Sequence, residues 1–144
     1  MQKTLLMIVI FFTLSIASEH IGSQSQVAVD GYDVVAYFRN NWPCHGKIEY
    51  TYSYMGKVWY FANLKNLEIF KETPEKFIPM FNGFNSAKIS KGKLDSANPL
   101  YFLIKENRLF LFSNKNEVNQ WKIDFAKEQK QAELKWSEYI LAKN

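Results

Sequence analysis

Residues 48–54 alternate strictly between apolar and polar positions. This period of two predicts a half-buried strand. Gly56 follows and suits a backbone turn with a positive φ. Residues 58–61, VWYF, then return as a strand that is apolar on both faces. The two segments together predict a β-hairpin.

A helical period begins directly after this hairpin. Leu64, Leu67 and Phe70 fall on one stripe, and Asn63 before them is a good N-cap. Proline interrupts a helix but fits the first position of a new helical turn. Pro74 therefore predicts both the end of this helix and the start of a short turn.

The later part of the chain repeats the alternation of strand and helix signals. Residues 81–99 are rich in Gly, Asn, Ser and Lys and predict a loop with a short strand. Residues 101–112 predict a second hairpin that turns at Glu106 and Asn107. Asn114 is then expected to cap one long helix, because the residues after it are strong helix formers.

The segment before the first hairpin is less certain in type. Residues 27–29 predict a short strand, and Asp30 and Gly31 predict a turn. Residues 34–38 are buried in either a helix or a strand, since periodicity does not distinguish the two over so short a run. Asp33 is expected to act as a cap for this segment.

These elements predict an α+β fold. We expect one small antiparallel sheet built from the two hairpins, with a short helix and a long C-terminal helix packed on it. No internal repeat is evident in the sequence, and residues 27–144 are expected to form a single domain.

The amino terminus has the pattern of a signal peptide. Lys3 provides positive charge, residues 5–14 form an apolar run, and Ser15 to Ala17 offers small residues for cleavage after Ala17. Residues 1–17 are therefore expected to be removed on export to the periplasm or the extracellular space. Residues 18–26 then form a flexible leader. No second apolar run approaches eighteen residues, so no transmembrane segment is expected in the mature chain.

Charge and cysteine content narrow the possible partners. The chain has 18 basic and 14 acidic residues, without a dense basic block of the kind that binds nucleic acid. Cys44 is the single cysteine, so an internal disulfide is impossible, whereas an intermolecular one is possible after export. Aromatic residues make up 17% of the chain and can supply the core instead.

Four sequence blocks resemble the exported YHS-domain proteins, and the resemblance covers residues 27–136. The blocks are GYDVVAYF (31–38), YMGKVWYFANLKNLEIFKETPEKF (54–77), FNGFNSAKISKGK (81–93) and RLFLFSN (108–114), followed by a late Trp136. Metal-binding relatives carry cysteines at positions that match Ala62 and Asn66, and exported relatives often carry another at the position of Asn85. Zinc and copper(I) sites depend on thiolate or imidazole donors. The resemblance therefore implies a retained scaffold without the thiolate site.

Two histidines leave a metal-handling alternative open. If cleavage follows Ala17, His20 becomes the third residue of the mature chain. The terminal amine, two amides and the imidazole would then form a square-planar site for Cu(II) or Ni(II). His45 follows Cys44 directly, but adjacent side chains in an extended loop point apart and rarely bind one ion together.

The aromatic hairpin and its corner are the candidate ligand site. The residues expected to contribute to a ligand-stacking surface are Tyr52, Trp59, Phe61, Asn66 and Asn85. These rings could equally form the core. No motif places a nucleophile beside a base, so a catalytic role is not expected. The sequence thus favours an exported YHS-like binding module for an unidentified small ligand or protein partner.

Overall fold

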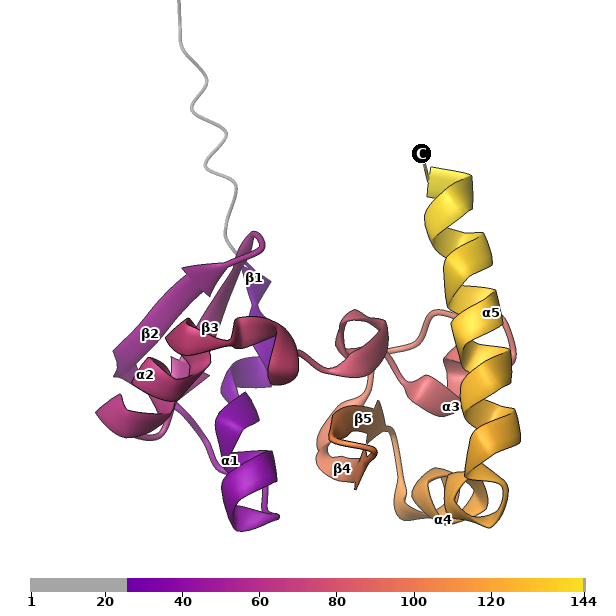
Figure 1. Ribbon diagram of the computed structural model, residues 1–144, viewed down its shortest axis with the longest axis horizontal. Coiled ribbons are helices and arrows are strands. Elements are labelled where there is room, and N and C mark those ends of the chain that lie inside the picture. The colour runs from indigo at the N-terminus through magenta and orange to yellow at the C-terminus, as the bar shows by residue number, and fades with distance from the viewer. Residues whose placement is uncertain (1–25, 144) are drawn as a thin grey trace, which may run out of the picture.

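The computed structural model describes residues 26–143. In the first half, residues 26–79, the elements are β1 (Gln26–Val27), η1 (Ala28–Gly31), α1 (Val34–Asn40), β2 (Lys47–Tyr54), β3 (Lys57–Phe61), α2 (Leu64–Glu72) and η2 (Pro74–Lys76). In the second half, residues 80–143, they are η3 (Met80–Gly83), α3 (Ser86–Ile89), β4 (Asn98–Lys105), β5 (Arg108–Phe112), α4 (Lys115–Ile123) and α5 (Phe125–Lys143). Here α denotes an α-helix and η a 3₁₀ turn. Figure 1 shows the two halves side by side, with α5 along the outer edge of the second.

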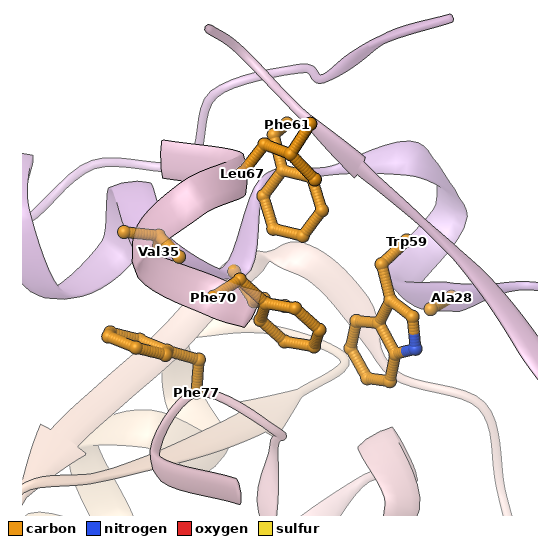
Figure 2. Packing of buried hydrophobic residues seen from close by; sticks show 8 residues of the cluster. Ala28, Val35, Trp59, Phe61, Leu67, Phe70 and Phe77 are labelled. Carbon is orange, nitrogen blue, oxygen red and sulfur yellow. The ribbon is translucent and has the colours of Figure 1, made fainter. Parts of the chain in front are cut away.

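The first half is built around the predicted β2–β3 hairpin. Tyr52 pairs with Trp59, and the turn passes through Met55 and Gly56, which both have positive φ. Strand β1 adds to β3 in parallel, so the sheet order is β1-β3-β2. Helix α2 packs against the hairpin, and Phe70 lies at the centre of a buried aromatic cluster (Figure 2).

The second half has its own sheet and its own core. Strands β4 and β5 form a two-stranded antiparallel sheet. Phe110 and Phe112 of β5 pack against Trp121 of α4, with ring centroids 5.4 Å and 5.3 Å apart. Phe125 and Trp136 of α5 cover the same cluster.

The two halves repeat one structural motif. Each contains, near its start, a 3₁₀ turn with two residues in the left-handed region: Val29 and Asp30 in η1, and Phe81 and Asn82 in η3. A buried cap residue, a short helix, a hairpin and a nine-residue helix then follow in the same order.

The dihedral angles of the nine-residue helices support this correspondence. Asn63 before α2 has φ −157° and ψ 166°, and Asn114 before α4 has φ −159° and ψ 166°. The capping residues that end the helices, Thr73 and Asp124, also agree, with ψ 67° and 63°. The expectation of no internal repeat was therefore wrong. The repeat escapes notice in the sequence because it keeps caps, turns and apolar positions rather than residue identities.

Tyr37 joins the two halves. Its side chain is fully buried, and its hydroxyl donates a 2.7 Å hydrogen bond to the carbonyl of Pro99. The Tyr37 ring packs edge-on against Phe102 of β4, and with Leu109 and Leu111 of β5 it forms a third buried cluster. We call this contact between α1 and the β4–β5 sheet the seam.

The α+β class is confirmed, but three details differ from the expectations. The two hairpins form two separate sheets rather than one. Residues 86–89, expected within a loop, form helix α3, because Asn85 caps them with its side chain. The single helix expected after Asn114 is two helices, α4 and α5, which are separated at Asp124 by a non-helical ψ.

The type of the segment that the sequence left open is also resolved. Residues 34–40 are helical, and Asp33 accepts hydrogen bonds from the first turn as a cap. Over residues 26–143, no helix combines the length and the apolar character needed to cross a membrane.

Candidate functional site

The hairpin–helix corner of the first half is closed by a buried carboxylate. Asp33 Oδ1 caps α1, while its Oδ2 accepts from the backbone N–H of Ala62 at 2.8 Å and from Asn66 Nδ2 at 2.6 Å. Asp33 is fully buried and Asn66 is 3% exposed. Arg39 donates to Asn66 Oδ1 at 3.1 Å, so each polar atom of this corner has a partner within the protein.

The second half contains the equivalent corner with the chemistry exchanged. Asn85 Oδ1 caps α3, and its Nδ2 donates to Ser113 Oγ at 2.6 Å and to Glu117 Oε2 at 2.9 Å. The backbone N–H of Ser113 also donates to Glu117 Oε2. Lys88 lies 3.8 Å from the other carboxylate oxygen of Glu117.

The three positions at which the resemblance implies thiols in relatives belong to two different corners. Ala62 and Asn66 lie beside Asp33, whereas Asn85 lies beside Glu117. Each corner holds one carboxylate and one carboxamide joined by a hydrogen bond. Such pairing satisfies buried polar groups and accounts for the burial of Asn66 and Asn85 without any ligand.

The predicted stacking residues are not gathered on one open surface. Phe61 is fully buried and Trp59 is 3% exposed, and both pack against Phe70. Tyr52 is half-buried beside Phe70, with the Lys71 ammonium over its ring. The suggested ligand-binding roles of Tyr52, Phe61, Asn66 and Asn85 stay predictions. Of the five residues, Trp59 lines the cleft that is described in the next paragraph.

A cleft of about 610 Å³ lies between the β2–β3 hairpin and α5, and we call it the hairpin–α5 cleft. Trp59 contributes from the first half, and Trp136, Tyr139 and Ile140 contribute from α5. The rings of Trp136 and Tyr139 pack at a tilt of 31°, with centroids 5.3 Å apart. The remaining lining residues are Gln26, Met55, Lys57, Ile78, Asn82, Phe84 and Lys143.

Sequence reasoning missed the contribution of α5 to this cleft. Trp136, Tyr139 and Ile140 follow the i, i+3, i+4 spacing of one helix face. That spacing could have revealed an aromatic face, although not what lies opposite it. Ile140 is 41% exposed, so this face is only partly covered by the protein.

Among the residues that the structure describes, the two charged residues that line the cleft are basic. Lys57 of β3 is half-buried, and its ammonium donates to the Asn82 carbonyl at 3.3 Å and to Asn82 Oδ1 at 3.0 Å. Burial lowers the pKa of Lys57. Lys143, at the end of α5, lies over the Tyr139 ring. A smaller hollow of about 150 Å³ adjoins the cleft, shares Lys57, and is lined by the Asp30 carboxylate.

The residues considered for metal binding are dispersed. The His45 ring lies 4.0 Å from that of Tyr32, and Asn40 Nδ2 lies 3.8 Å from Cys44 Sγ. Within residues 26–143 there is no group of three or more His, Cys, Asp or Glu side chains that could hold a metal. His20 lies outside the described residues.

These features define a small α+β protein with two similar halves and a ligand-sized cleft between them. Residues 35–80 match the family model described as YHS domain. The chain therefore contains a YHS domain, and the predicted resemblance is confirmed over those residues. The match runs from α1 to the start of η3, so it lies almost entirely within the first half and leaves out β1 and η1. No curated protein and no solved structure gives a significant match to the chain.

Proposed function

We propose that this protein is an exported, non-catalytic binding module that holds a small apolar ligand in the hairpin–α5 cleft. The observation that carries the proposal is the cleft itself, with Trp59 on one wall and Trp136 and Tyr139 on the other. Ligand sites in proteins typically have volumes of about 300–1,000 Å³ and mainly apolar walls with a few polar groups. A cleft of about 610 Å³ lies within that range.

The position of the cleft also supports the proposal. Its walls come from both halves of the chain, and binding sites often lie between structural units. Met55, at the tip of the hairpin, is 75% exposed. Methionine adapts its shape to different apolar partners, which suits the rim of a binding site.

A neutral fluorescent probe tests ligand binding. Phenylnaphthylamine, which carries no formal charge, is expected to bind the folded chain with a stoichiometry of one and to gain fluorescence. Ile140→Glu places a charge on the cleft wall and should weaken binding about tenfold or more, because a carboxylate is costly to desolvate beside an apolar ligand. Leu134→Glu, on the same helix but outside the cleft, should leave binding unchanged.

The export part of the proposal rests on the pattern of residues 3–17. Mass spectrometry of the protein recovered from an exporting host should give a mature chain that begins at Ser18. A chain that keeps Met1 would contradict export. Absence of saturable phenylnaphthylamine binding, or equal weakening by Leu134→Glu and Ile140→Glu, would contradict the cleft as the binding site.

A further inference from the structure

We propose that the ligand of the hairpin–α5 cleft is an amphipathic organic anion whose acidic group pairs with Lys57. This inference rests on the proposed function and adds the charge of the ligand to it. The apolar walls of the cleft and the positive charge of Lys57 and Lys143 together favour such a ligand.

Lys57 has no acidic partner among the residues that the structure describes. Its hydrogen bonds run to two oxygens of Asn82, which are neutral. The ion pairs of residues 26–143 involve other basic side chains, namely Lys88, Arg108 and Lys135. The charge of a half-buried ammonium whose acceptors are all neutral is not balanced by a carboxylate. It is therefore available to pair with an incoming anion.

The surroundings of Lys57 favour an anion with an apolar body. Lys57 lines the cleft together with Trp59, Phe84 and Tyr139, and none of the described residues that line it is acidic. Burial lowers the pKa of Lys57, which reflects a site where the ammonium is under-solvated. An ion pair formed there is screened less by water than an exposed pair.

Two other charges fix the orientation of the ligand. Lys143 lies at the α5 side of the cleft and adds a second positive charge. Asp30 lines the smaller adjoining hollow, which Lys57 also lines. The acidic group is therefore expected within the larger cleft, and the apolar body between Trp59 and Trp136.

A matched pair of dyes separates charge from apolar contact. Anilinonaphthalene sulfonate has the ring system of phenylnaphthylamine with one added sulfonate. At low salt the wild-type protein should bind the sulfonate about tenfold more tightly, since a partly buried charge pair contributes on the order of one factor of ten. Raising the salt concentration should reduce this preference.

Variants at Lys57 assign the preference to one side chain. Lys57→Met should remove the preference for the sulfonate without weakening the neutral dye, and Lys57→Arg should keep it. Lys65→Met, on the exposed face of α2, is the matched control and should change neither affinity. Far-ultraviolet circular dichroism and urea unfolding must confirm that each variant is folded, because partly unfolded chains also bind the sulfonate.

The outcomes distinguish the two proposals. If both dyes bind the wild type equally and Lys57→Met changes neither affinity, the anionic ligand is excluded while the binding cleft stands. If neither dye binds, both proposals fail. A preference that survives in both Lys57→Met and Lys57→Glu would also overturn the role of Lys57.

Discussion

Asp33 and Asn85 occupy equivalent positions in the two halves of the chain, and both are fully buried N-caps. Asp33 is a carboxylate that accepts from the carboxamide of Asn66, whereas Asn85 is a carboxamide that donates to the carboxylate of Glu117. Each half thus keeps one acid and one amide, with the two residues exchanged.

Replacing the amide donor of one corner with a second carboxylate should be strongly destabilising. Asn85→Asp places a carboxylate within hydrogen-bond distance of Glu117, and we expect the free energy of unfolding to fall by about 3 kcal/mol. Adding Glu117→Gln restores one donor and one acceptor and should recover most of the loss. Urea unfolding of the two single variants and the double variant measures the coupling. Additive effects would contradict the pairing.

Removal of the Tyr37 hydroxyl should loosen the seam. Tyr37→Phe keeps the ring contact with Phe102 but deletes the hydrogen bond to Pro99, at a cost of about 1–2 kcal/mol in the free energy of unfolding. Tyr139→Phe, on partly exposed α5, should cost much less and serves as the control. Equal stability of Tyr37→Phe and the wild type would show that the seam does not depend on this bond.

The same residue predicts an alkaline limit of stability. Burial, as the largest cause, raises the pKa of Tyr37 well above its ordinary value. Since the unfolded chain loses this proton at lower pH than the folded chain, the stabilisation is complete below the ordinary tyrosine pKa and decreases as the pH rises above it. Ultraviolet titration counts the tyrosines that ionise only when the protein unfolds. Tyr37→Phe should contain one fewer of them than the wild type. A full normal titration of the native wild type would refute this.

Gly46 should not tolerate a side chain. A Cβ at Gly46 would lie 2.4 Å from the carbonyl carbon and the Cβ of Tyr60, so Gly46→Ala should lower the free energy of unfolding by about 2–3 kcal/mol. Gly56→Ala is the contrasting variant, because it meets no atom within 4 Å and is strained only by its φ of 73°. It should cost about 1–2 kcal/mol. Thermal unfolding compares the two, and a larger loss for Gly56→Ala would be inconsistent with the close contact at Gly46.

The exposed pair of Tyr54 and Glu75 predicts a local acid effect. The hydrogen bond from the Tyr54 hydroxyl lowers the pKa of Glu75. Because the folded pKa is lower than the unfolded one, the contribution is present above the ordinary carboxyl pKa and is lost as the pH falls through the folded value. Carbon NMR titration should show that Tyr54→Phe returns the Glu75 pKa toward its ordinary value. An unchanged titration curve would exclude the bond in solution.

Local signals in the sequence predicted the local structure well. Asn63 and Asn114 cap helices as expected, and the turns at Gly56 and at Glu106 and Asn107 close the two hairpins. These features depend on residues that are neighbours in the chain, so their chemistry is readable without the fold. The break at Asp124 contains neither proline nor glycine, so no local residue pattern predicted it.

Features that depend on distant residues were less accessible. The separation of the hairpins into two sheets depends on strand pairing across the chain, which alternation alone does not specify. Asn66 and Asn85 looked polar enough for a surface site, but their partners, Asp33 and Glu117, lie far away in the sequence. The cleft likewise combines Trp59 with Trp136, and only the tertiary arrangement brings their elements together.

The two equivalent corners also bear on how the sequence of such a chain can change during evolution. Each corner satisfies its own polar groups, so a substitution beside Asp33 leaves the hydrogen bonds around Asn85 in place. One half can therefore acquire or lose donor atoms while the other continues to hold its own sheet and helix together. The exchanged acid and amide are the result expected of such independent change, because either order of the two residues pairs the buried polar groups of a corner.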